Sequence, residues 1–191
     1  MKKSKEVWSH LAVGAVWFLL VAFLRGKVDW GLLGLGLGAF LGIFLLDIDH
    51  LFYWFLTNPE KEDSQEAKRI WETKDKGFLG FKQALKKLWE LLSANHKTHM
   101  RLVFHSLLGQ IVLLILAVFV LTSSGSLFGS ALILSLNLHL LKDEWEDFFK
   151  SKEHLADWLF WQVREPKLEE HLGVYLGGVS FIFLLLTGFL I

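Results

Sequence analysis

The chain has 191 residues, a length that favours one domain, residues 1–191. Its hydrophobic content of 53% and its mean hydropathy of +0.41 exceed those of ordinary soluble proteins and indicate a membrane protein. Twenty basic and twenty acidic residues cancel, so bulk electrostatics do not favour a nucleic-acid partner. The absence of cysteine excludes disulfides, thiolate metal sites and cysteine nucleophiles. Any metal site must therefore use His, carboxylate or water.

Two apolar runs lie in the first 56 residues. The first, about residues 7–24, could be a secretory signal, but a basic turn (25–27) follows it in place of a small-residue cleavage site, which favours a retained span. Residues 31–56 are long enough to cross about 30 Å of hydrocarbon. Small residues recur along this second run at four-residue spacing, at Gly34, Gly38 and Gly42. Their spacing predicts close packing against another helix.

A polar insertion, residues 58–101, follows with 10 Lys/Arg and 7 Asp/Glu. Within it, apolar residues recur at helical spacing at Phe78, Phe81, Leu85, Leu88, Trp89 and Leu92. This pattern predicts an amphipathic helix, lying either on anionic lipid or on the protein's own helices.

Three further apolar runs, about residues 102–121, 127–141 and 172–191, predict spans three to five. In the fifth, we expect Gly173, Gly177 and Gly178 to be packing residues. The acidic segment 142–171 is rich in apolar and aromatic residues at Trp145, Phe148, Phe149, Leu155, Trp158 and Leu159, which predicts an interfacial or capping amphipathic helix. The fold class is therefore an all-α integral membrane bundle of about five transmembrane helices with amphipathic interfacial helices.

The distribution of Lys and Arg predicts the orientation of the chain in its membrane. With a cytoplasmic N-terminus, the inside segments (1–6, 58–101 and 142–171) hold eighteen Lys/Arg and the outside turns hold two. The insertion and the acidic segment are then cytoplasmic.

This orientation places ionisable residues from the ends of four spans at one membrane face. They are His10; Asp47, Asp49 and His50; His96, His99 and His105; and His139 with Asp143. On a helix, Asp47 and His50 share a face at i and i+3, as do His139 and Asp143 at i and i+4. Ionisable groups at the edge of hydrocarbon are costly unless a partner charge or a metal offsets their desolvation. The sequence therefore predicts a His/Asp metal centre, although a single His or Asp there is often only an interfacial residue.

Imidazole and carboxylate ligands suit zinc, with manganese or iron as alternatives, and several carboxylates can bridge two ions. The expected ligands are His10, Asp47, Asp49, His50, His99, His105, His139 and Asp143. Asp49 and Asp143 are also the candidate water-activating bases. Arg101 or Lys97 could bind an anionic substrate group. We assign no role to His154 or His171, which have no evident partner in the sequence.

With these residues in place, three segments and His10 resemble the YdjM-like family of bacterial inner-membrane proteins, regarded as metal-dependent hydrolases. The segments are Leu46-Asp47-Ile48-Asp49-His50, the stretch from His99 to His105-Ser106, and His139-Leu-Leu-Lys-Asp143. The family pattern has Pro where this chain has Leu46, Thr where it has Ser9, and a closer upstream histidine, which leaves His96 and His99 both open as the matching residue. The resemblance extends over residues 10–143 and omits the insertion, the acidic segment and the fifth span.

The family is similar to all-α zinc-dependent phospholipase C and to single-strand nucleases, and the resemblance therefore implies phosphoester hydrolysis at a metal cluster. Because the residues lie at headgroup depth, we expect membrane lipid as the surroundings and a lipid-borne or small phosphoester as the substrate. Two alternatives are a metal or proton transporter, since intramembrane Asp and His can form a relay, and a non-catalytic scaffold that acts through the polar segments.

Overall fold

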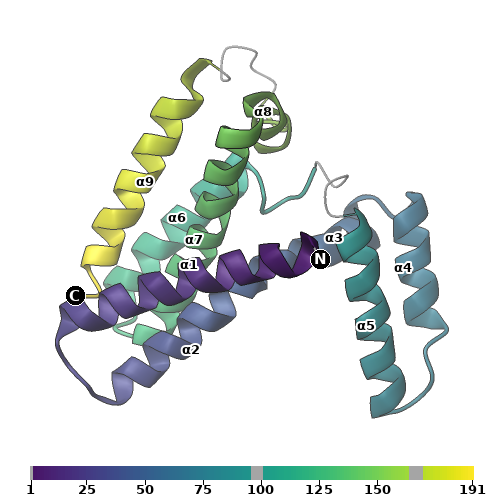
Figure 1. Cartoon of the computed structure of the whole chain (residues 1–191), viewed down its shortest axis with the longest axis horizontal. Helices are drawn as coiled ribbons and strands as arrows, with labels where there is room; N and C mark the ends of the chain where they lie inside the picture. The colour runs from purple at the N-terminus through teal and green to yellow at the C-terminus, as the bar shows by residue number, and fades with distance from the viewer. Residues whose placement is uncertain (1, 96–100, 164–169) are drawn as a thin grey trace. The chain divides into compact units, whose positions relative to one another are not determined.

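A computed structural model of the chain describes residues 2–95, 101–163 and 170–191 (Figure 1). Throughout these ranges the regular structure is helical, which confirms the all-α prediction. The α-helices are α1 (Lys2–Arg25), α2 (Trp30–Leu45), α3 (Asp49–Phe52), α4 (Glu62–Glu72), α5 (Phe78–Asn95), α6 (Leu107–Ser123), α7 (Leu127–Lys150), α8 (Lys152–Leu159) and α9 (Leu172–Gly188). A 3-10 turn (Leu46–Ile48) precedes α3, and a π-helical turn (Tyr53–Thr57) follows it.

The chain divides into two compact units, which we call the bundle unit (residues 1–46 and 104–191) and the hairpin unit (47–103). The hairpin unit contains the predicted insertion but begins at Asp47 rather than at residue 58. The predicted second span is also not one uniform helix, because the 3-10 turn interrupts it at Leu46–Ile48. A 3-10 stretch within a longer helix often marks a functional position, and this one contains Asp47.

Local sequence explains where the helices of the bundle unit begin. Asp29 accepts a hydrogen bond from the Leu32 N–H at the start of α2, and Ser126 accepts one from Gly129 at the start of α7. Such side chains satisfy amide groups that the first helical turn leaves unpaired. Gly125, with φ of 59°, lies in the turn before α7, in a backbone region that favours glycine.

Helix α7 is the centre of the bundle unit and packs against α1, α2, α6, α8 and α9. Leu134 and Leu140 are completely buried, and Leu138 contributes to the same apolar core. Figure 1 shows α7 (green) beside α6 (teal), with α1 (purple) crossing it. The helix that carries His139 and Asp143 is thus held by neighbours on several sides.

The glycine stripe of α2 is a close-packing surface, as predicted. A Cβ atom built on Gly38 would lie 2.3 Å from the Phe128 carbonyl oxygen, and one built on Gly42 would lie 2.4 Å from that of Leu132. The Ser135 hydroxyl donates to the Ala39 carbonyl at 2.6 Å across the same contact. The backbones of α2 and α7 therefore approach too closely for a side chain larger than hydrogen.

The corresponding prediction for α9 was wrong at Gly177 and Gly178. Both are exposed, and a Cβ atom built on either would meet nothing within 4 Å. Gly173 is exposed as well, and a Cβ there would make only an ordinary contact with Phe148, at 3.7 Å. The small residues of α9 therefore do not form a backbone-to-backbone contact within the described structure.

Contacts between helix ends show that α1 and α9 end side by side and that α2 and α7 begin side by side. Arg25, at the end of α1, donates to the Leu190 carbonyl at 2.6 Å, next to the end of α9. Gly31, at the start of α2, lies against Leu127, at the start of α7. Five alternating spans would bring these four positions to one membrane face.

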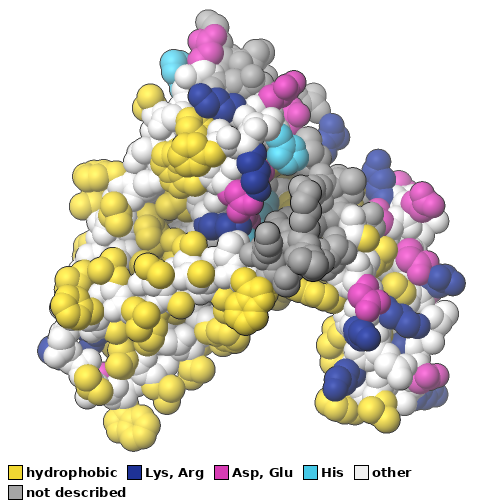
Figure 2. Space-filling view, in the orientation of Figure 1, with side chains coloured by type: hydrophobic (Ala, Val, Ile, Leu, Met, Phe, Trp, Pro, Cys, Tyr) yellow, Lys and Arg dark blue, Asp and Glu magenta, His cyan; other side chains and the backbone are white. Residues whose placement is uncertain are grey.

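Two helical stretches in the described structure, Val7–Arg25 and Trp30–Thr57, are long and apolar enough to cross a membrane. The apolar helices α6 and α9 have 17 residues each, the lower end of the length needed to span hydrocarbon. Large apolar side chains are exposed on four helices of the bundle unit, for example Phe23, Phe40, Ile115 and Phe181. Figure 2 shows such side chains (yellow) gathered over α1 and α2. A surface of this kind is expected where helices face lipid.

The acidic segment contains the end of α7 and the short helix α8 rather than one interfacial helix. Leu155, Trp158 and Leu159 of α8 are buried in the core of the bundle unit. The Trp158 indole donates to Asp147 at 2.9 Å. Of the two predicted roles, capping the bundle is the one that the described residues show.

The hairpin unit is organised by the antiparallel helices α4 and α5. Its small core contains Tyr53, Trp54, Ala67, Leu88 and Leu102. The Trp54 indole donates to Asp63 at 2.9 Å, so its one polar atom is satisfied although the ring is buried. The predicted amphipathic helix is confirmed as α5.

Candidate metal centre

Four ionisable side chains from distant parts of the sequence meet inside the bundle unit. His10 Nε2 lies 3.0 Å from Asp143 Oδ1, and His139 Nε2 lies 3.1 Å from Asp143 Oδ2. The rings of His10 and His139 have centroids 4.2 Å apart, and that of His105 lies 5.6 Å from His139. All three imidazoles are buried. The structure thus brings together residues that the sequence predicted from the ends of three separate spans.

The orientation of His139 is fixed by the backbone of α2. Its Nδ1 lies 2.5 Å from the Ile43 carbonyl oxygen. Because a carbonyl can only accept, this contact requires the proton on Nδ1 and directs Nε2 toward Asp143. With a second proton on Nε2 the ring donates to Asp143, whereas without that proton Nε2 presents the lone pair that binds a metal ion. The close approach of α2 and α7 at Gly42 therefore also places the ring of His139.

Asp143 is positioned to carry negative charge. Burial alone would raise the pKa of Asp143, but the charge of His139 and hydrogen bonds from His10 and His139 outweigh it and hold the pKa well below its usual value. The Lys142 ammonium group, 3.1 Å from Oδ1, adds a further cation. The carboxylate is therefore ionised at neutral pH, as a metal ligand must be.

The donor set fits a divalent ion. One ligand atom from each of His10, His139 and Asp143 lies within 4.8 Å of the others. Zinc bonds of 2.0–2.1 Å in tetrahedral geometry separate neighbouring ligand atoms by roughly 3.3 Å, and each imidazole lies near that distance from one oxygen of Asp143, His10 at 3.0 Å from Oδ1 and His139 at 3.1 Å from Oδ2. Two imidazoles and one carboxylate are a ligand set found in catalytic zinc sites.

The residues at the start of α6 explain how His105 reaches this cluster. His105 is buried immediately before the helix, and Ser106 accepts a hydrogen bond from the Gly109 N–H at 3.1 Å. This cap begins α6 at Leu107, two residues after the histidine, and so fixes the backbone beside it. His105 lies against the ring of His139, and its role as a metal ligand stays a prediction.

A buried polar group beside the centre was missed by the sequence analysis. Glu144 is completely buried, accepting hydrogen bonds from the Gln110 amide at 3.0 Å and from the Tyr175 hydroxyl at 3.2 Å. Its burial raises the pKa of Glu144 to about 8. The sequence shows only that Gln110 and Tyr175 are polar residues within apolar runs. It does not indicate that their side chains face Glu144.

We expect Glu144 to give the metal-free protein a distinct pH dependence of stability. Between its ordinary pKa of 4.5 and about 8, the folded chain holds a proton that the unfolded chain has released. The free energy of unfolding therefore falls as pH rises through this window, by at most about 1.4 kcal/mol per pH unit, and this contribution levels off above it. Thermal unfolding across the window should show a shallower slope for Glu144→Gln than for the wild type. Identical slopes would show that Glu144 is already ionised in the folded protein.

The other predicted site residues lie in the hairpin unit or outside the described residues. Asp49 is buried and accepts a hydrogen bond from the Val103 N–H at 3.2 Å, His50 is also buried, and Asp47 is half-buried. Arg101 is exposed. His99 and Lys97, with the alternative His96, lie outside the described residues. These residues do not belong to the unit that holds His10, His139 and Asp143. Their roles in the metal centre therefore stay predictions.

The expectation that His154 has no partner was wrong. His154 has a partner, since its Nε2 lies 3.6 Å from Asp147 Oδ2. Both residues belong to the end of the bundle that α8 covers, and Asp147 also accepts from Trp158. The sequence did not reveal this pair because the turn between α7 and α8 brings residues 147 and 154 together.

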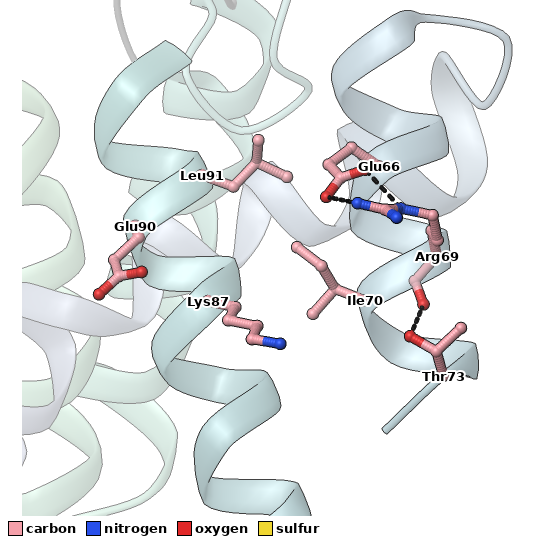
Figure 3. Close-up of a pocket in the computed structure, with 7 residues that line it drawn as sticks. All are labelled: Glu66, Arg69, Ile70, Thr73, Lys87, Glu90 and Leu91. Carbon is pink, nitrogen blue, oxygen red and sulfur yellow. Dashed lines mark hydrogen bonds and ion pairs between the residues drawn. The ribbon is translucent and has the colours of Figure 1, made fainter. Parts of the chain in front are cut away.

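The hairpin unit contains a pocket of about 430 Å³ between α4 and α5 (Figure 3). Arg69 donates two hydrogen bonds of 2.7 Å to Glu66, and Lys87 and Glu90 also line the pocket. Because its charges are of both signs and the guanidinium is already bound to a carboxylate, the lining favours no charged ligand.

Comparison with known proteins gives no further assignment. No family model, no curated protein and no solved structure matches the chain. The likeness to the YdjM-like family therefore stays a prediction from sequence motifs. What can be concluded about function rests on the chemistry of His10, His105, His139 and Asp143.

Proposed function

We propose that the protein is a membrane-bound, metal-dependent hydrolase that cleaves a phosphoester, with a divalent ion held by His10, His139 and Asp143. The observation that carries the proposal is the convergence of two buried imidazoles on one buried carboxylate at 3.0 and 3.1 Å. Desolvation of such groups is costly unless they are paired or bind a metal. Zinc is the ion that this ligand set suits best, with manganese and iron as alternatives.

The residues of the centre have separable roles in this proposal. His139 is held by the Ile43 carbonyl so that Nε2 faces Asp143, and the two side chains would hold the ion, with Asp143 supplying the negative charge. Lys142 pairs with both Asp143, at 3.1 Å, and Glu146, at 2.6 Å, and so helps to hold the carboxylate of Asp143 in place. When bound, the ion would activate water and stabilise charge on the phosphoryl oxygen. His105 completes the group as a further imidazole at the edge of the His139 ring.

The membrane topology belongs to the same proposal. We infer five spans in the cell inner membrane, provided by α1, α2 with the turns that follow it, α6, the apolar part of α7 (127–141) and α9. The helix ends that lie side by side and the exposed apolar side chains of these helices support this arrangement. The excess of Lys and Arg at the N-terminus and in residues 58–101 and 142–171 supports a cytoplasmic location for the metal centre.

The position of the centre along α7 favours a lipid-borne substrate. His139 lies in the last turn of the apolar part of that helix and Asp143 follows directly after it, so both would lie where hydrocarbon gives way to headgroups in a five-span topology. A phosphodiester or phosphomonoester of a membrane lipid would present its phosphorus at this depth. A small soluble phosphoester is the alternative within the same chemistry.

Purified protein in lipid nanodiscs tests the proposal. We expect phosphate or headgroup release from lipid phosphoesters with added zinc or manganese, and a loss of at least about a hundredfold in His139→Ala, since a ligand is removed rather than one of its supporting partners. Asp47→Ala tests in the same assay the sequence prediction that Asp47 contributes. Activity that is unchanged in His139→Ala, or metal flux without hydrolysis in proteoliposomes, would contradict the proposal.

A further inference from the structure

Helix α5 of the hairpin unit has two apolar faces. The inner face is buried against α4, and the outer face is largely exposed in the described fold. The inner face contains Ala84 and Leu88, which are buried, and Leu88 packs with Ala67 of α4. The outer face consists of large apolar residues three or four positions apart, which is about one helical turn. We call these residues the outer stripe: Phe78, Phe81, Leu85 and Trp89. Their exposed fractions are 79%, 42%, 47% and 49%. An ordinary surface helix buries its single apolar stripe, so the outer stripe is available for a further partner.

Aromatic residues extend this surface onto α4. The ring of Trp71, which is partly exposed, lies 6.1 Å from that of Phe81 in an edge-to-face arrangement. The Lys74 ammonium group lies 4.1 Å from the centre of the Trp71 ring, within the range of a cation–π contact. The exposed aromatic surface therefore belongs to the whole hairpin and has a cation at its edge.

The charge beside the outer stripe is positive. Residues 74–95 contain five lysines and two acids, a formal charge of +3. Lys82 lies one helical turn after Phe78, and Lys86 lies one turn after Lys82. Both lysines therefore border the stripe along α5. Glu90 lies 3.9 Å from Lys86 but on the side of the helix away from the stripe. Large apolar side chains bordered by lysines form the pattern of a helix that lies in the interface of an anionic membrane.

We propose that the outer stripe of α5, with Trp71, lies on the anionic lipid surface of the membrane that the apolar helices cross. Trp and Phe favour the boundary between headgroups and hydrocarbon, and the lysine stems can cover apolar surface while their ammonium groups reach lipid phosphates. A protein surface would need both an apolar groove and a matching row of acids, whereas an anionic bilayer supplies both properties everywhere. This inference concerns attachment and does not depend on hydrolysis.

The sequence keeps this surface within reach of a bilayer. The helical stretch Trp30–Thr57 is long and apolar enough to cross a membrane, and α4 begins after only four further residues, 58–61. Four extended residues span at most about 14 Å. The hairpin is therefore tethered close to the surface that the proposal assigns to it, and the tether favours docking by raising the effective lipid concentration.

The absence of cysteine allows a test with a single labelled site in the full chain. Leu85→Cys, in the outer stripe, carries a polarity-sensitive fluorophore, and Gln83→Cys, exposed on another side of the same helix, is the matched control. Each protein is reconstituted in phosphatidylcholine vesicles with or without phosphatidylglycerol, and nitroxide-labelled lipid is the quencher. Helical content and the thermal midpoint of each variant verify that it is folded.

We expect several-fold stronger lipid quenching at position 85 than at position 83 in anionic vesicles, and less quenching at high salt. Lys82→Gln with Lys86→Gln should lower the ratio of docked to undocked hairpin roughly 30-fold at low salt, because two lysines leave the lipid surface. Equal quenching at the two positions would overturn the proposal. An emission at position 85 that is shifted to shorter wavelength but is not quenched by lipid would also overturn it, and would show that the protein's own helices or a second copy cover the stripe.

Discussion

Asp143→Asn is expected to abolish tight binding of zinc by the purified protein while leaving the helical bundle folded. Asn keeps the size of the side chain and can still bond to one imidazole, but it removes the negative charge that His10 and His139 both face. Loss of a partner outside the ligand set already lowers metal affinity by about 10–100-fold, so loss of a ligand should exceed that range. Zinc content after gel filtration and a competitive chelator titration would measure the effect.

Asp147→Asn is the matched control, because Asp147 lies one turn further along α7 and also faces a histidine, His154, at 3.6 Å. In the described structure, this pair has no second imidazole beside it. We expect Asp147→Asn to keep the zinc content of the wild type. Equal zinc content in Asp143→Asn and the wild type would show that the ion, if any, binds elsewhere.

Gly42→Ala is expected to destabilise the bundle unit strongly, because its new methyl group would meet the backbone of α7. The new Cβ would lie 2.4 Å from the Leu132 carbonyl oxygen and 2.7 Å from the Ser135 Cβ, and a backbone carbonyl cannot move aside as a side chain can. Overpacking of this kind costs about 1–3 kcal/mol, occasionally more. The thermal midpoint in detergent should fall, and zinc affinity should fall with it, because the same helix contact places the Ile43 carbonyl on His139.

Gly177→Ala provides the control for this substitution. Gly177 is helical and exposed, and nothing lies within 4 Å of a Cβ built there. Alanine in a helix interior is favoured over glycine by roughly 0.5–1 kcal/mol, so Gly177→Ala should raise the midpoint slightly or leave it unchanged. If both substitutions had the same effect, the close approach of α2 and α7 would not be a feature of the folded protein.

Much of the centre could be predicted because its residues obey simple periodicity. His139 and Asp143 are at i and i+4 on one helix, and His10 and His105 lie at span ends that the charge distribution assigns to the same membrane face. An ionisable residue at the edge of an apolar run is conspicuous in a sequence. Their convergence follows from helix direction alone, without knowledge of side-chain packing.

Other features depend on which face of a helix meets which neighbour, and sequence does not specify this. Gly42 and Gly177 are both glycines within apolar helices, yet only Gly42 lies against a backbone. Glu144 follows Asp143 in a charged stretch, yet its side chain is completely buried, facing Gln110 and Tyr175. The interruption of the second span at Leu46–Ile48 was missed because a change from α-helical to 3-10 hydrogen bonding has no residue pattern of its own in a stretch this short.

X-ray absorption at the zinc edge of the loaded protein would test whether His10, His139 and Asp143 hold a common ion. The proposed ligand set predicts nitrogen and oxygen neighbours at about 2.0–2.1 Å, with the outer-shell scattering of at least two imidazoles. In His139→Ala the imidazole scattering should fall by one ring. An all-oxygen environment, or an identical spectrum in His139→Ala, would contradict the assignment of this cluster as a metal centre.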